Sequence, residues 1–91
     1  MTVNTETIVN TLKMEQLSNS AKIVYLLLNY SSNENKVAKI NNKNISESTG
    51  LAEITISNAL ANLEVTGMIT RGFELDTSVP GALIRTIEIL K

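Results

Sequence analysis

A run of apolar residues with little polar interruption dominates the first third of the chain. Between Ser18 or Ser20, either of which can cap a helix, and about Tyr30, apolar side chains occur on most sides of the predicted helix. A helix that is apolar nearly all round belongs in the middle of a small domain. The polar residues 31–35 then predict a loop, and residues 37–40 a short strand.

Two further helices are predicted in the middle of the chain. A short one covers about residues 42–49 and ends at Gly50, and a longer one covers about 52–65 and ends at Gly67. Glycine at these ends is expected because it adopts a left-handed conformation at little cost. The longer helix has one apolar face, made by Ile56, Ala59, Leu60 and Leu63.

The two ends of the chain follow different patterns. Residues 2–16 fit either a helix capped by Asn4 or Thr5 or, from their alternating residues, a strand; the helix is favoured. Residues 68–75 and 83–90 predict two strands, and the second alternates most clearly. The turn-rich residues 76–81 connect them as a hairpin. The order of elements predicts an α+β fold.

Composition narrows the classes of function. The chain has 91 residues, 43% of them hydrophobic and 3% aromatic, which suits one domain with an aliphatic core. It contains no cysteine and no histidine, so disulfides, the usual catalytic nucleophiles and bases, and common zinc sites are excluded. No glycine-rich phosphate loop and no paired carboxylates are evident. We therefore expect no enzyme activity, no catalytic residues, no metal and no cofactor.

Targeting signals are also missing from the sequence. The longest apolar cluster, residues 23–28, is far too short to span a bilayer, and no signal peptide precedes the domain. We expect a cytoplasmic protein that does not associate with membranes.

Charge is unevenly distributed although the net charge is only −1. Residues 11–43 contain five lysines and two glutamates, a net charge of +3. Residues 44–91 contain three basic and six acidic residues, a net charge of −3. A nearly neutral protein can bind DNA when its cations cluster on one face.

The segment from Asn44 to Arg71 resembles the winged helix-turn-helix family of DNA-binding regulators. The matching features are the Ile45-Ser46 pair, the Gly50-Leu51 turn, the run Thr55-Ile56-Ser57-Asn58-Ala59-Leu60, the Leu63-Glu64 pair, and Gly67 followed by Met68-Ile69. The resemblance covers roughly residues 18–90. It implies a three-helix core with a C-terminal β-hairpin wing at residues 18–91, and an extra N-terminal segment at residues 1–17.

The family resemblance also implies a function and a site. The helix at about 52–65 would be the recognition helix that binds double-stranded DNA sequence-specifically, as part of transcription regulation. Asn58 and Asn62 lie four residues apart, hence on one face, and an asparagine amide pairs with N6 and N7 of adenine. The predicted DNA-binding residues are Lys43, Thr55, Ser57, Asn58, Asn62, Arg71 and Arg85. The departure from the family is the acidic helix-turn-helix, which carries Glu47, Glu53 and Glu64 and no basic residue.

Other roles of such a domain remain open. The same fold serves plasmid or phage replication and partition adaptors, and some winged helices bind protein partners instead of DNA; an acidic helix-turn-helix fits the last class. We also expect a homodimer, because regulators of this type usually read two half-sites. Residues 1–17, which the core motif does not use, are the candidate dimerisation helix.

Overall fold

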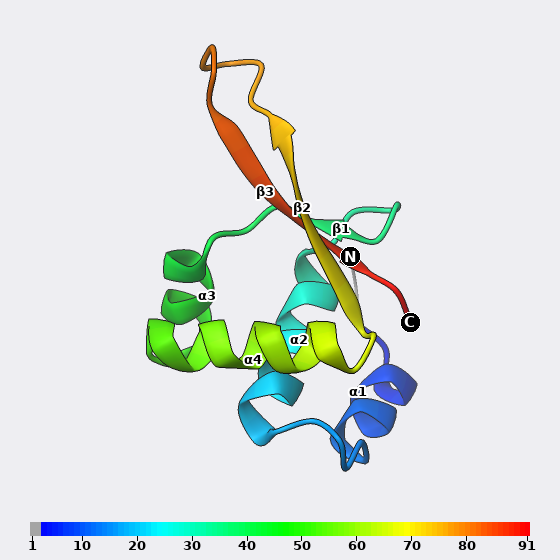
Figure 1. The fold of residues 1–91 in the computed structure, drawn as a ribbon. Helices are drawn as coiled ribbons and strands as arrows, with labels where there is room; N and C mark the ends of the chain where they lie inside the picture. Colours follow the sequence, from blue (N-terminus) through cyan, green and yellow to red (C-terminus); the bar gives the residue numbers. More distant parts are fainter. Residues whose placement is uncertain (1–2) are drawn as a thin grey trace.

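A computed structural model describes residues 3–91 as an α+β domain with four helices and a three-stranded antiparallel sheet (Figure 1). The helices lie together in the body of the domain, and two long strands extend out of it as a hairpin. Along the chain the elements are α1 (Thr5–Leu12), α2 (Asn19–Ser31), β1 (Val37–Ala38), α3 (Asn42–Thr49), α4 (Glu53–Val65), β2 (Ile69–Leu75) and β3 (Leu83–Ile89).

Three helices begin at a polar side chain that accepts a backbone N–H; the sequence predicts the caps of the first two but not that of the third. The side chain of Asn4 accepts from the amide of Thr7, that of Ser18 from Ala21, and that of Asn41 from Asn44. The N-terminal segment is therefore a helix capped by Asn4, and the alternative reading of it as a strand is wrong. Each such cap satisfies a donor that the helix itself leaves unpaired.

The sheet has the order β1-β3-β2, so β3 is its central strand. β2 pairs with β3 along its whole length, from Ile69 opposite Ile89 to Leu75 opposite Leu83. β1 pairs only through two residues, and the predicted strand over 37–40 is correspondingly too long. The chain leaves the sheet after Ala38 because Asn41 already caps α3.

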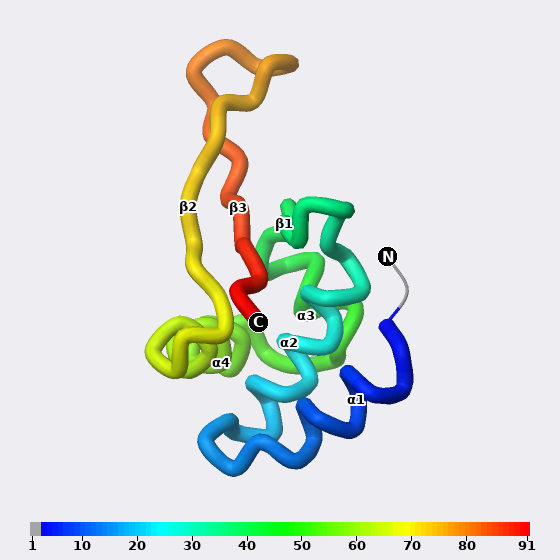
Figure 2. Tube along the Cα trace, turned by 90° about the vertical axis from the view of Figure 1, so that its right-hand side faces the viewer, coloured from blue at the N-terminus to red at the C-terminus, as the bar shows by residue number. Residues whose placement is uncertain are grey.

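The core lies between α2, α3, α4 and the inner end of the sheet (Figure 2). Ile56, Ala59, Leu60 and Leu63 of α4 are all buried, as predicted from their spacing. From the sheet, Ile69, Ile87 and Ile89 complete this core, and Met68 joins it from the turn before β2.

The N-terminal helix α1 packs against the body without burying all its apolar residues. Thr11 is buried and donates its hydroxyl to the carbonyl of Thr7, and Met14 packs against the core. Ile8, Val9 and Leu12 stay exposed, and the role of α1 in dimerisation remains a prediction. Within residues 3–91, every helix falls short of the length and apolar character needed to cross a membrane.

Gly50 closes α3 with φ of +76°, in the left-handed region, and its amide donates to Ser46. A Cβ atom at Gly50 would meet nothing within 4 Å, so the need for glycine is conformational and not steric. Gly50→Ala should therefore lower the free energy of unfolding by about 1–2 kcal/mol. Gly50→Asn should cost clearly less, because asparagine tolerates this conformation. Thermal unfolding of the two variants checks this, and equal losses would contradict it.

Candidate nucleic-acid interface

Four exposed residues of α4 form an uncharged ridge, and the exposed acids Glu53 and Glu64 lie beside it on the same helix. Ile54, Asn58, Ala61 and Val65 succeed one another at intervals of three or four residues, and all four are exposed. We call these four residues the α4 ridge. Within residues 3–91 the amide of Asn58 makes no hydrogen bond, so both its donor and its acceptor are available to a ligand.

On one side of the α4 ridge, a shallow groove of about 440 Å³ separates α4 from the start of α2. Thr55 and Asn62 lie on this side, and both are half-buried. The Asn62 amide is engaged at both ends: its oxygen accepts from the backbone N–H of Ser18 (3.0 Å), and its nitrogen donates to the carbonyl of Gln16 (3.4 Å). Asn62 therefore holds the α1–α2 connection against α4. The groove is lined by Gln16, Ser18, Ser20, Thr55, Asn58, Ala59 and Asn62.

On the other side of the α4 ridge, a chain of hydrogen bonds joins α4, α3 and the hairpin. Arg85 on β3 donates to the side-chain oxygen of Asn42 (2.6 Å) and to the backbone carbonyl of Ile40 (2.7 Å). The amide nitrogen of Asn42 in turn donates to the hydroxyl of Ser57 on α4 (3.2 Å). This network brings together two predicted site residues, Ser57 and Arg85. Asn42, which sequence analysis missed as a site residue, connects them.

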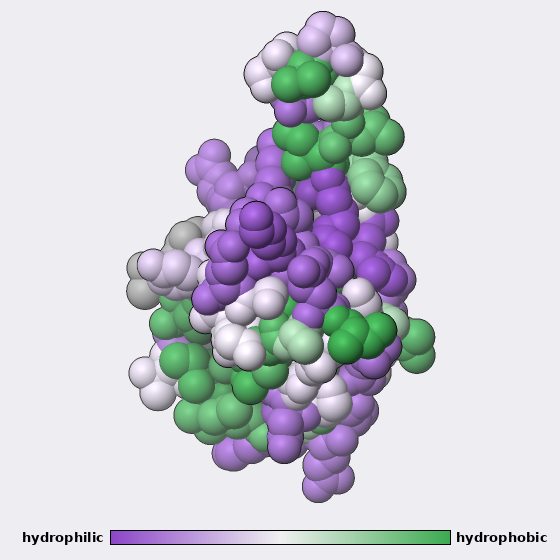
Figure 3. Space-filling view, turned by 90° about the vertical axis from the view of Figure 1, so that its left-hand side faces the viewer, coloured by the Kyte–Doolittle hydropathy of each residue, from purple (hydrophilic) through white to green (hydrophobic). Residues whose placement is uncertain are grey.

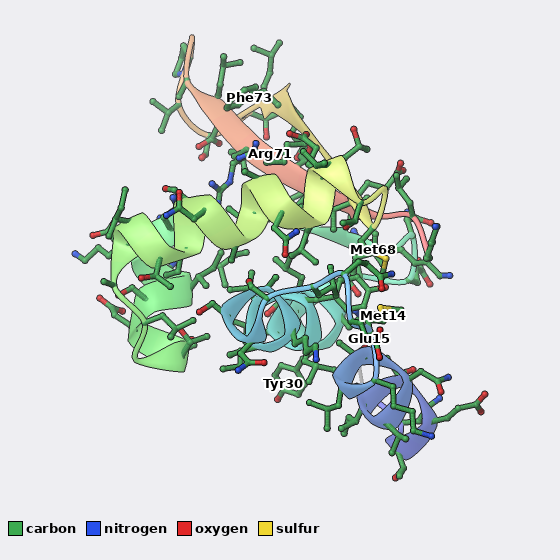
Figure 4. All side chains as sticks on the ribbon, turned by 60° about the horizontal axis from the view of Figure 1, so that its bottom comes forward. Met14, Glu15, Tyr30, Met68, Arg71 and Phe73 are labelled. Carbon is green, nitrogen blue, oxygen red and sulfur yellow. The ribbon has the colours of Figure 1, made fainter. Side chains whose placement is uncertain are left out.

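Arg71 lies between α4 and the hairpin, and Phe73 lies further along β2 (Figure 4). The guanidinium of Arg71 contacts the carboxylate of Glu64 at 2.8 Å, and both side chains are substantially exposed. The hydrogen bond from Arg71 is the main cause that lowers the pKa of Glu64 below its ordinary value, with attraction between the two charges adding to it. Because the pair is exposed, a competing anion such as a phosphate can reach Arg71.

Arg85 is the half-buried cation of this region, and its partners are all neutral. Burial is the main cause that lowers its pKa, and repulsion by the charge of Arg71 lowers it further. Its Nε atom is buried and, within residues 3–91, has no hydrogen-bond partner. This guanidinium lacks the carboxylate that usually compensates a buried charge, and an anion could reach it only through the remaining N–H groups of its two Nη atoms.

The predicted lysine of the site lies apart from this network. Lys43 is exposed on the first turn of α3 and forms no ion pair within the described part of the chain. Two other lysines, in the segment before α3, differ from Lys43: Lys39 contacts Glu74 at 2.6 Å, and Lys36 adopts a left-handed conformation with φ of 62° in the loop before β1. Of the three predicted cations, Arg71 contacts α4 directly, Arg85 is linked to it through Asn42, and Lys43 lies on the neighbouring helix α3.

Comparisons of this chain with protein-family models, with curated proteins and with solved structures found no significant match. Its function is therefore inferred from the geometry and chemistry of its own residues.

Proposed function

We propose that the chain is a winged helix-turn-helix protein that binds double-stranded DNA and regulates transcription in the cytoplasm, with α4 as its recognition helix. One observation carries this proposal: the uncharged α4 ridge, with the unoccupied amide of Asn58 on it, lies beside the guanidinium groups of Arg71 and Arg85. The order of α2, α3, the turn at Gly50, α4 and the β2–β3 hairpin supports it.

The ridge has the dimensions and chemistry for the major groove. Helix α4, which carries the ridge, has 13 residues and is therefore about 20 Å long. A helix of ordinary diameter fits into the major groove of DNA, which is about 12 Å wide. In this proposal Asn58 pairs with the edge of an adenine, and Ile54 contacts a thymine methyl. No side chain caps α4 at Ala52, so the amides of its first turn have no partner within the helix, but the exposed carboxylate of Glu53 in the same turn opposes a phosphate there.

In this proposal the phosphate contacts come from cations on the side of the ridge that faces α3 and the hairpin. Arg85 has no acidic partner, whereas Arg71 exchanges the carboxylate of Glu64 for a phosphate. Lys43 extends the contact to the start of α3. Each such contact releases counterions from the DNA, so the affinity falls as salt concentration rises.

A binding assay with duplex DNA at two salt concentrations tests this proposal. On the best duplex from a random-sequence selection, Asn58→Ala should cost about 1–3 kcal/mol, and on random duplex much less, because it removes a base contact. Arg71→Ala should weaken binding to all duplexes alike and reduce the salt slope by about one unit. A parent protein without any salt-dependent affinity for DNA would refute the proposal.

The second candidate function is binding of a protein partner through the same ridge. Its supporting observation is that Ile54 and Val65, 69% and 87% exposed, lie on the same exposed ridge of α4 as Asn58. Exposed apolar residues of this kind are typical of the centre of protein interfaces. In that case the parent protein has no salt-dependent affinity for DNA, and neither Asn58→Ala nor Arg71→Ala changes DNA binding. A replication or partition adaptor would give the same DNA-binding results as a transcription regulator.

A further inference from the structure

We propose that two copies of the chain form a dimer by pairing the outer edges of their β2 strands, with Phe73 on the twofold axis and a six-stranded sheet as the result. This inference concerns the dimer that we expect to bind DNA, but it rests on the hairpin alone. β2 is the terminal strand of the sheet, and along its outer side the described part of the chain places no other strand. Figure 2 shows β2 at the left edge of the sheet, on the far side of β3 from β1, with α4 near its lower end.

The hydrogen bonds that flank the hairpin define which backbone groups of β2 are unpaired. Leu90 donates to Met68 just below β2, and Asp76 donates to Ala82 just above it. Hydrogen-bonded pairs alternate along an antiparallel ladder, so the even-numbered residues of β2 bond to β3. The N–H and C=O groups of Arg71, Phe73 and Leu75 consequently point outward. An exposed strand edge of this kind is a template for pairing with another chain.

Apart from Arg71, the exposed side chains on one face of this edge are apolar. Phe73 and Leu75 of β2 and Leu83 of β3 share one face of the hairpin, because paired residues of neighbouring strands lie on the same side. Phe73 is 69% exposed and Leu83 is 62% exposed. Figure 3 shows patches of apolar surface on the outer part of the hairpin, below a more hydrophilic tip. A twofold axis at Phe73 joins the two sets of three side chains into one cluster.

A second copy is the occupant that this edge fits best. With Phe73 on the axis, Arg71 lies opposite Leu75 of the partner subunit, so no like charges face each other, and the two Phe73 rings form a cross-strand pair. A twofold axis at Arg71 or at Glu74 would instead place identical charges opposite each other. The other side of β3, beyond its short pairing with β1, is less accessible than the edge of β2. The chain before α3 passes beside it, and the carbonyl of Ile40 accepts a hydrogen bond from Arg85 there.

Disulfide cross-linking of full-length variants tests the register directly, because the chain contains no cysteine. A hydrogen-bonded antiparallel pair has Cα atoms about 5.5 Å apart, within the range of a disulfide. Phe73→Cys should therefore give a covalent dimer under mild oxidation. Leu83→Cys is the matched control, since it has similar exposure on the same face but would lie roughly 20 Å from its counterpart, three strand spacings across the sheet and four residues along it.

Sedimentation of reduced protein without DNA is the second measurement. The parent should sediment with twice the 9.9 kDa mass of the chain. Phe73→Lys should be monomeric because it places two ammonium groups together on the axis, and Phe73→Pro because it removes the outward N–H without breaking the bonds to β3. Leu12→Lys, on the exposed side of α1, should stay dimeric.

Three results would overturn the proposal: a monomeric parent, a dimer that Leu12→Lys dissociates and Phe73→Lys does not, or cross-linking through Leu75→Cys or Leu83→Cys in preference to Phe73→Cys. Because neither measurement contains DNA, their outcome is independent of whether α4 binds DNA. A dimer without salt-dependent affinity for DNA would refute only the proposed function.

Discussion

Leu60→Ala should lower the free energy of unfolding by about 2–5 kcal/mol, because it deletes three carbons from a fully enclosed position. Leu60 is 0% exposed and lies on the buried face of α4, where α4 packs against α2 in the middle of the core. For a domain of this size such a loss lowers the thermal midpoint by on the order of 10 °C or more. Thermal unfolding followed by circular dichroism provides the measurement. All samples need the same protein concentration, because dimer formation makes stability concentration-dependent.

Leu12→Ala is the matched control for this experiment. It deletes the same atoms from an exposed leucine at the end of α1, and we expect a change within about 0.5 kcal/mol. Equal destabilisation by both substitutions, or none by Leu60→Ala, would show that the buried face of α4 is assigned wrongly.

The helices and the hairpin could be predicted because their signals are local. Ser18 and Asn4 cap the helices that follow them, and Gly50 and Gly67 adopt positive φ where the helices end. The buried face of α4 follows from the 3.6-residue period alone. These features depend on residues at most four apart, which is the range over which a single sequence is informative.

The contacts of the candidate site could not be predicted, because they join residues far apart in the chain. Asn42 connects Ser57 with Arg85 across 15 and 43 positions, and only the packing of α3 against α4 and the hairpin brings them together. Asn62 shares a helix face with Asn58 by spacing, yet its amide holds the backbone at Ser18. Period and propensity place a residue on a face, but they do not specify what that face meets.

The β3 strand illustrates the same limit. Its alternation places Leu83 on the same side as Ile87, but Ile87 is buried and Leu83 is exposed. The hairpin extends beyond the helices, so its outer half has no helix to cover it (Figure 1). The alternating pattern is correct for the strand, while the extent of the core is set by the lengths of the helices beneath the strand.

Arg85 makes the hairpin and the start of α3 one unit, and its removal should therefore affect both stability and DNA binding. Its two hydrogen bonds, to Asn42 and to Ile40, are the side-chain bonds that tie β3 to the chain before α3. Arg85→Met keeps the apolar stem but leaves both acceptors without their donor, and should cost about 1–3 kcal/mol of unfolding free energy. Under the proposed function it also removes one phosphate contact.

Arg85→Lys separates these two roles. Lysine keeps the charge but lacks the planar fork that reaches both acceptors at once, so this variant should lose part of the stability, as Arg85→Met does. It should nevertheless retain the salt slope of DNA binding, which should fall by about one unit in Arg85→Met alone. Thermal unfolding and duplex binding at two salt concentrations measure the two effects. An unchanged salt slope in Arg85→Met would show that Arg85 does not contact a phosphate. An unchanged free energy of unfolding in both variants would show that the hydrogen bonds of Arg85 do not hold the hairpin to α3.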